Sequence, residues 1–214
     1  MDGVLGNGSQ PVNLLLSLGL LSVASFVVVM MTSFVRIVIV LSLVRSALGT
    51  QTVPPNMVIT GLALVLTLIT MMPTLRQINT QAVVPYQSHQ IEQKDLIRRV
   101  VAPMQSFMLR QTQKTDLTYF GTVSHASVSD PSRAPLYVVV PAFVVGELRA
   151  GFAIGLALYL PFIAIDLAVS AILMGLGMMM LSPNIVSLPI KLLLFVTVNG
   201  WALVCGNLVQ SFRQ

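Results

Sequence analysis

Charged side chains are scarce in this sequence, where only 9% of the 214 residues are Asp, Glu, Lys or Arg and 55% are hydrophobic. A soluble domain carries roughly 25% charged residues. So few charges cannot cover a water-facing surface of this size, which excludes an ordinary soluble protein. We expect a single structural unit, much of whose surface faces lipid or a large protein partner.

Cysteine is almost absent, and the basic residues are not clustered. Cys205 is the only cysteine, so an internal disulfide is excluded, and its apolar surroundings indicate inert packing. The net charge is +5, but the densest basic cluster is only Lys94, Arg98 and Arg99. Because nucleic-acid binding requires a basic patch or stripe, we expect no nucleic-acid partner.

Catalytic and metal-binding motifs are also missing. The sequence contains no metal-ligand spacing, no nucleophile motif and no phosphate-binding loop. His89 and His125 are isolated, and each is more typical of a surface histidine than of a ligand. We therefore expect no enzyme activity, no metal site and no cofactor.

The N-terminus lacks the basic start of a secretory signal peptide, because the first basic residue is Arg36. Residues 12–35 contain no charge, and this apolar stretch is too long for the core of a signal peptide. We interpret it as a retained helix.

Residues 1–75 are predicted to form an N-terminal hydrophobic hairpin. Apolar residues resume after Arg36, so the whole run is far longer than the roughly 20 residues that a spanning helix needs. Gly49 and the Pro54-Pro55-Asn56 segment predict a turn. A second apolar run follows and is expected to close at Pro73.

Residues 76–135 form a polar middle region that holds both histidines and seven of the twelve basic residues. Apolar side chains recur in it at helical spacing, which predicts short amphipathic helices, with an interruption at Pro103. Residues 124–135 are rich in Ser, Asp and Pro and are expected to be a loop.

Residues 136–214 are predicted to form a C-terminal hydrophobic hairpin. Its first arm should run over residues 137–180 and its second over residues 192–212, with prolines at the tip between them. The predicted fold class is therefore an all-α membrane protein. It has two long kinked helical hairpins and a helical polar middle region.

Five charged residues lie in or beside the apolar runs: Arg36, Glu147, Arg149, Asp166 and Lys191. A central charge in a spanning helix costs roughly 2.5–3.5 kcal/mol on insertion scales. We expect Arg149 to snorkel towards the membrane surface. We expect the other four to pair with opposite charges, within the chain or between chains, because such pairs fix register. A proton or ion relay is the alternative.

Three consecutive methionines, Met178, Met179 and Met180, follow Gly175 and Gly177. Methionine is flexible and polarizable, so it fills irregular gaps and adapts to varied surfaces. Core packing at a helix end is one interpretation. Three adjacent side chains, however, point in three directions, so one core-facing stripe cannot hold them all. In a ring of chains they would form a soft collar that seals a pore and deforms around a passing polypeptide.

Several motifs are spread along the chain, at residues 32–41, 47–51, 54–56, 107–112, 141–143, 147–148, 177–180, 188–195 and 200–201. These segments resemble the FliP/SctR family of export-gate proteins. They extend over residues 32–212, which is nearly the whole chain. Flagellar members of the family often begin with a cleaved signal, and this sequence differs from them there.

The resemblance implies a core subunit of a type III protein export gate, flagellar or virulence-associated. The gate lies in the bacterial inner membrane within the secretion or flagellar basal body. The resemblance implies a helical ring of five such subunits with FliQ/SctS-like and FliR/SctT-like partners. Unfolded exported proteins pass through its centre. FlhB/SctU-like and FlhA/SctV-like export components are further expected partners.

The resemblance also implies roles for particular residues. The methionine cluster of the family forms a pore gasket, which corresponds here to Met178, Met179 and Met180. Charged positions that join neighbouring subunits in the family match Arg36, Glu147, Asp166 and Lys191.

The polar middle region carries seven basic and four acidic residues, so the positive-inside rule predicts a cytoplasmic location. The resemblance implies a periplasmic one. We adopt the latter, because the rule weakens for loops near 60 residues. The alternative function is a small-molecule or ion transporter. Asn199 and Asn207 are polar residues in the second apolar arm, but they do not belong to a convergent polar set.

Overall fold

The computed structural model describes residues 14, 18, 19, 22, 26–50, 52–126, 130, 134–178 and 180–212. Within these residues the secondary structure is helical and contains no strand, as the predicted fold class requires. The principal elements are α2 (Phe34–Ala47), α3 (Asn56–Ile78), the π-helical turn η1 (Asn79–Val83), α4 (Val84–Gln87), α5 (Gln93–Gln111), α6 (Lys114–Val123), α7 (Leu136–Gly175), α8 (Pro183–Thr197) and α9 (Gly200–Gln210). The predicted helix over residues 12–35 falls partly outside the described part of the chain, and within that part residues 26–30 are helical.

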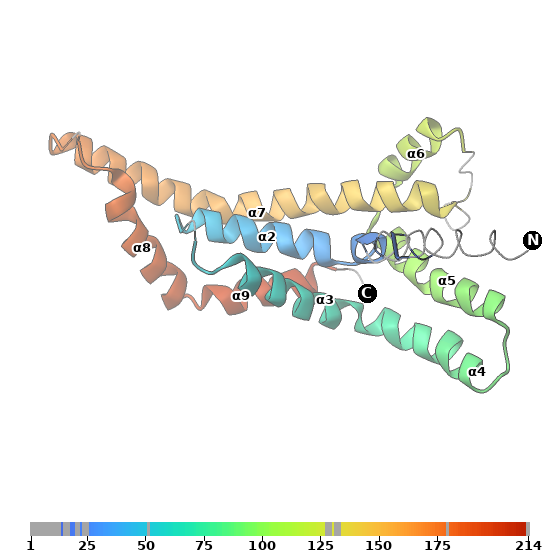
Figure 1. The fold of residues 1–214 in the computed structure, drawn as a ribbon. Coiled ribbons are helices and arrows are strands. Elements are labelled where there is room, and N and C mark those ends of the chain that lie inside the picture. Colours follow the sequence, from blue (N-terminus) through green and yellow to red (C-terminus); the bar gives the residue numbers. More distant parts are fainter. Residues whose placement is uncertain are drawn as a thin grey trace, which may run out of the picture.

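The helices form an elongated bundle along α7 (Figure 1). Helix α2 lies against α7 and is followed by α3 on its other side, while α8 and α9 return from the far end of α7 towards the middle of the bundle. Helices α4, α5 and α6 lie at the opposite end. The two hydrophobic hairpins therefore pack together, and the polar middle region extends from one end of them.

Helix α2 is the centre of the core. Ile37, Val40 and Leu41 are completely buried, and Val44 is nearly so. Because α7 and α3 cover α2 on two sides, apolar residues occupy most of its surface. This explains why α2 is hydrophobic without a polar face.

Two glycines allow α2 to approach α7 closely. A Cβ atom on Gly151 would lie 3.2 Å from Ile39 Cγ2, and one on Gly155 would lie 2.3 Å from Leu43 Cδ1. Gly151 and Gly155 are four residues apart and therefore lie on the same face of α7. This is the small-xxx-small arrangement that brings helix backbones together in membranes.

The predicted helix breaks at two prolines were wrong. Pro73 lies inside α3, which continues to Ile78, and Pro103 lies inside α5. An internal proline costs about 3 kcal/mol. Pro103 is buried together with Phe107, one turn further on, whereas Pro73 is itself exposed and lies between the buried residues Met71 and Thr74. Burial of these residues helps to offset the cost. Helix α3 is also continuous across residues 75 and 76, and the division into regions at that point stays a prediction.

The turns of the two hairpins depend on residues with positive φ. Gly177 has a φ of +75°, and its N–H donates to Met174 O while that of Met178 donates to Leu173 O. These two bonds make a Schellman motif, which ends α7. Gly49, with a φ of +77°, similarly follows the end of α2 in the predicted turn.

The second arm of the C-terminal hairpin is broken rather than continuous. Helix α8 already begins at Pro183 and contains Pro189, and it is separated from α9 by a bend of 63°. Asn199, with a φ of +52°, provides the bend. A Cβ atom on Gly200 would lie 2.3 Å from the ring of Phe195, so α9 can start at this angle only because residue 200 has no side chain.

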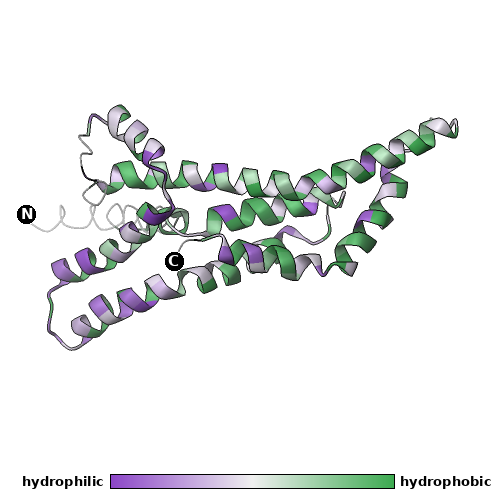
Figure 2. Ribbon diagram, turned by 180° about the vertical axis from the view of Figure 1, so that it is seen from behind, coloured by the Kyte–Doolittle hydropathy of each residue, from purple (hydrophilic) through white to green (hydrophobic). Residues whose placement is uncertain are grey.

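Within the described residues, two continuous helical segments are long and apolar enough to cross a membrane, Asn56–Gln87 and Leu136–Gly175. The bent pair α8 and α9 is a third if it counts as one span. Hydrophobic residues dominate α7 and α8, whereas α4 and α5 are largely hydrophilic (Figure 2). The molecule is therefore a membrane protein whose polar part lies at one end of the bundle.

Candidate functional site: two charge pairs and a methionine tip

Arg36 of α2 and Glu147 of α7 form a buried ion pair. Arg36 Nε donates to Glu147 Oε2 at 2.9 Å, and Arg36 Nη2 donates to Glu147 Oε1 at 2.5 Å. The side chain of Glu147 is completely buried, and that of Arg36 is 7% exposed. Such a bidentate pair fixes the relative orientation of its two side chains as well as the distance between them. It therefore sets the register of α2 on α7.

The same arginine also holds the C-terminal end of α9. Its Nη1 atom donates to the carbonyl oxygen of Ser211 at 3.2 Å and to Ser211 Oγ at 3.4 Å. The ring of Phe212 lies 4.1 Å from the guanidinium carbon, a cation–π contact. Arg36 thus links α2, α7 and α9 at one point.

Asp166 of α7 is paired with two residues of α8 at the other end of the hairpin. Lys191 Nζ donates to Asp166 Oδ2 at 2.6 Å, and Ser187 Oγ donates to Asp166 Oδ1 at 2.7 Å. Lys191 and Ser187 are buried, because they lie four residues apart on the face of α8 that packs on α7. This pair fixes the angle at which α8 leaves the tip.

A polar cavity of about 410 Å³ adjoins the second pair. It is lined by Asp166 and Lys191 and also by Arg45 at the end of α2. Arg45 donates to Asn56 Oδ1 and, at 3.4 Å, to the carbonyl oxygen of Pro54. The three charged groups at this cavity therefore come from both hydrophobic hairpins.

The structure thus brings the four predicted residues together as two pairs within one chain. Among the described residues, no buried side-chain nitrogen or oxygen lacks a hydrogen-bond partner. The role that the resemblance implies for Arg36, Glu147, Asp166 and Lys191 at contacts between subunits stays a prediction.

The snorkelling expected of Arg149 stays a prediction, and the structure gives this arginine a carboxylate partner. Arg149 Nη2 donates to Asp116 Oδ1 at 2.8 Å and Nη1 donates to Asp116 Oδ2 at 3.0 Å, which ties α7 to α6. The Arg149 side chain remains 53% exposed while that of Asp116 is 9% exposed. The pair keeps Arg149 near the polar middle region, where a charge is not forced into lipid.

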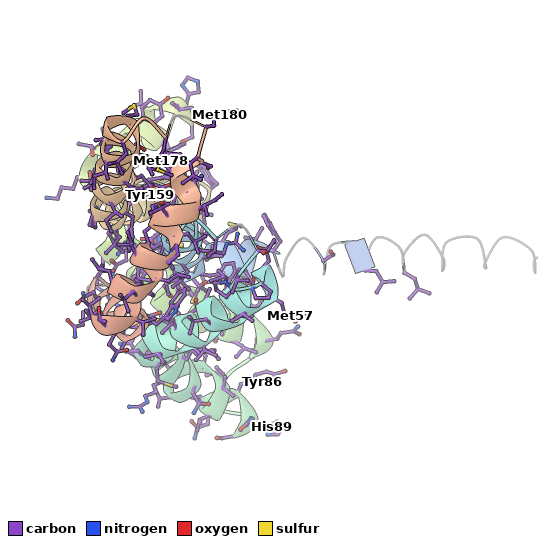
Figure 3. All side chains as sticks on the ribbon, turned by 90° about the vertical axis from the view of Figure 1, so that its left-hand side faces the viewer. Met57, Tyr86, His89, Tyr159, Met178 and Met180 are labelled. Atoms are coloured by element: carbon purple, nitrogen blue, oxygen red, sulfur yellow. The ribbon has the colours of Figure 1, made fainter. Side chains whose placement is uncertain are left out.

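Met178 and Met180 lie in the connection between α7 and α8, and this tip is at the opposite end of the bundle from α4, α5 and α6 (Figure 1). Met180 is fully exposed and Met178 is 45% exposed. Met179 lies outside the described residues. Figure 3 shows the two labelled methionines together at one end of the view, and Tyr86 and His89 at the other. The tip therefore presents soft apolar side chains that the described part of the chain does not bury.

Sequence reasoning missed Asp116, Gly151 and Gly155. Asp116 belongs to the polar region and is distant in sequence from Arg149, so no local pattern marks this pair. The glycines, by contrast, form a visible G-x-x-x-G motif within the apolar run.

Where the chain is described, no three His, Cys, Asp or Glu residues could share a metal ion. Asn207 lines a cavity between α7 and α9, and Asn199 does not.

The fold and the charge pairs together define a class: all-α membrane proteins whose bent hairpins are held together by intrachain ion pairs. The sequence model of the FliP family matches residues 17–208. The chain is 48% identical over 204 residues to the flagellar biosynthetic protein FliP of Pectobacterium carotovorum subsp. carotovorum, covering 95% of this chain and 78% of that protein.

Two further relatives carry the same name. The chain is 44% identical to FliP of Bacillus subtilis (strain 168), over 96% of this chain and 94% of that protein. It is 43% identical to FliP of Aquifex aeolicus (strain VF5), over 97% and 88% respectively. The chain belongs to the FliP family, which confirms the resemblance found in its motifs.

Proposed function

We propose that this chain is a core subunit of the flagellar type III protein export gate in the bacterial inner membrane. Five copies form a helical ring with FliQ-like and FliR-like partners, and unfolded proteins pass through the centre. FlhB-like and FlhA-like components complete the export machinery. Family membership and the flagellar names of the relatives support this proposal and favour a flagellar over a virulence system.

The observation that carries the ring is the surface of α7 that the chain leaves exposed. Large apolar side chains are exposed on this helix from Phe152 to Met174. Asp166 lies within that stretch, and its side chain is 33% exposed. A charged group at membrane depth is costly unless it faces protein or water. Part of this surface is therefore better covered by protein.

The structure of the α7–α8 tip supports a role for the methionines as a pore gasket. Met178 and Met180 are exposed beyond the Schellman motif at Gly177, and the Asp166–Lys191 pair fixes the angle of the helix that follows. A ring would bring several such tips together around one axis. Flexible methionines there can close a pore and still adapt to polypeptides of different sequence.

Native mass spectrometry of the full chain, purified in mild detergent with its co-expressed operon neighbours, tests this proposal. We expect a discrete homo-oligomer, at a fixed multiple of the 23.1 kDa chain, that also carries smaller hydrophobic subunits. A monomer or simple dimer under several gentle conditions would contradict the ring and favour the transporter alternative.

A further inference from the structure

A basic cavity of about 650 Å³ lies where α5, α6 and α7 meet the end of α9. Its basic lining residues are Arg36, Arg110, Lys114 and Arg149, and its described lining contains no Asp or Glu. Its volume is within the usual range of ligand sites, about 300–1,000 Å³. We call it the basic cavity.

Among the described residues, two of the four positive charges in this cavity have no acidic partner. Arg36 is paired with Glu147, and Arg149 with Asp116. Arg110 donates a hydrogen bond to the Ser106 hydroxyl at 3.4 Å, and in the described part of the chain neither Arg110 nor Lys114 has a carboxylate partner. The basic cavity therefore keeps a net charge of about two units that an anion can neutralise.

An apolar groove of about 440 Å³ continues from the basic cavity. The groove lies between α7 and α9 and is lined mainly by Ile154, Leu158, Leu203 and Leu208. Ser211 lines both the groove and the basic cavity, so the two spaces meet at this residue. A single ligand with an anionic head and an apolar tail would fit the two together.

The position of this site along α7 matches a membrane surface. On the side of the middle region lie the charged residues Arg110, Lys114 and Arg149. On the other side, α7 exposes Phe152, Leu156 and other large apolar residues. Headgroup phosphates of a bilayer lie at such a polar–apolar boundary, and basic pockets between membrane helices bind anionic headgroups.

We propose that this chain binds one anionic phospholipid. Its phosphate lies between Arg110 and Lys114 in the basic cavity, and an acyl chain occupies the apolar groove between α7 and α9. The positive charge of the basic cavity supports the placement of the phosphate. The meeting of the two spaces at Ser211 supports the placement of the acyl chain. The proposal does not depend on the ring or on export.

Native mass spectrometry with added lipid tests the site on the full chain in mild detergent. The probes are palmitoyl-oleoyl phosphatidylglycerol and phosphatidylcholine with the same acyl chains. We expect one phosphatidylglycerol per chain, retained at least tenfold more tightly than phosphatidylcholine. The double variant R110Q/K114Q should weaken this binding about tenfold to thirtyfold, since each basic residue near a headgroup contributes about 1 kcal/mol.

A second variant tests the apolar groove separately. Ala157 lines the groove, and Ala157→Phe should weaken phosphatidylglycerol binding by filling the space for the acyl chain. The controls are K94Q/R98Q, which removes two exposed charges elsewhere on α5, and Ala164→Phe, which adds the same ring two turns further along α7. Both controls should bind lipid as the unmodified chain does.

Three outcomes would overturn the proposal. Equal binding of the two lipids would show no headgroup site. Displacement of phosphatidylglycerol by millimolar inorganic phosphate, with no effect of Ala157→Phe, would show a phosphate site without a lipid tail. A dimer that forms when lipid is removed and is lost in R110Q/K114Q would assign the basic cavity to a second copy of the chain.

Discussion

The guanidinium of Arg36 and the carboxylate of Glu147 face each other through two hydrogen bonds, of 2.9 and 2.5 Å, across 111 residues of sequence. Both side chains are buried, so each charge depends on the other. Because Arg36 also contacts Ser211 and Phe212, this one pair joins the start of α2, the first third of α7 and the end of α9. The two hydrophobic hairpins are therefore held as one body.

Glu147→Gln should destabilise the chain by about 3–5 kcal/mol, because it leaves the buried Arg36 without a counter-charge. The double variant R36M/E147L removes both charges and should lose less stability than Glu147→Gln. Thermal unfolding in detergent, followed by circular dichroism, measures both. Arg98→Gln, an exposed change, is the control. A loss below about 1 kcal/mol in Glu147→Gln would mean that the pair does not hold the hairpins together.

Gly155→Ala should destabilise the packing of α2 on α7. The new Cβ atom would lie 2.3 Å from Leu43 Cδ1 and 3.0 Å from Leu43 Cβ, so the two helices must move apart. Such overpacking costs about 1–3 kcal/mol. Gly61→Ala is the matched control, because nothing lies within 4 Å of its Cβ position. Equal unfolding temperatures for the two variants would contradict the close approach of α2 and α7.

Removing either partner of the Asp166–Lys191 pair should weaken ring assembly. Asp166→Asn leaves the buried Lys191 without a carboxylate, and Lys191→Gln leaves Asp166 with only the Ser187 hydroxyl. Each change should cost on the order of 2 kcal/mol, the range for hydrogen bonds to charged groups. The yield of the assembled complex on size-exclusion chromatography measures the effect. A normal yield from both variants would show that assembly does not need the Asp166–Lys191 pair.

Replacing Met178, Met179 and Met180 with alanine should raise ion leak through the assembled gate. The shorter side chains cannot meet across a pore, whereas the ion pairs that hold the hairpins remain in place. Ion conductance across vesicles that contain the complex measures leak, and native mass spectrometry checks that the ring still forms. Met57→Ala, at an exposed methionine on α3, is the control. An assembled ring with unchanged leak would contradict the gasket.

The helices were predictable from the sequence where hydrophobic runs end at strong turn signals. The turn between α2 and α3, with Gly49 and the Pro54-Pro55-Asn56 segment, lies where it was expected. The start of α7 near Tyr137 was also expected. Pro73 and Pro103 were misjudged because a proline stops a helix only when tertiary packing does not offset its cost, and packing is not visible locally.

The charge pairs were predictable in kind but not in partner. A charged side chain in an apolar run is costly to insert into a membrane, so the few that occur there are expected to pair with opposite charges. That Arg36 meets Glu147, and Asp166 meets Lys191, depends on how the two hairpins pack. No partner was predicted for Arg149, because Asp116 is 33 residues away in a different region. Only the folded chain brings them together.

Cross-linking of an arrested export substrate tests the central claim, that unfolded proteins pass the methionine tip of this chain. A photoreactive residue is placed at Met180, or at Tyr119, which is 64% exposed on α6 at the other end of the molecule. In the assembled gate we predict a cross-link from position 180 that disappears when the substrate is not engaged, and none from position 119. No cross-link at position 180, with the substrate shown to be arrested in the gate, would contradict the account.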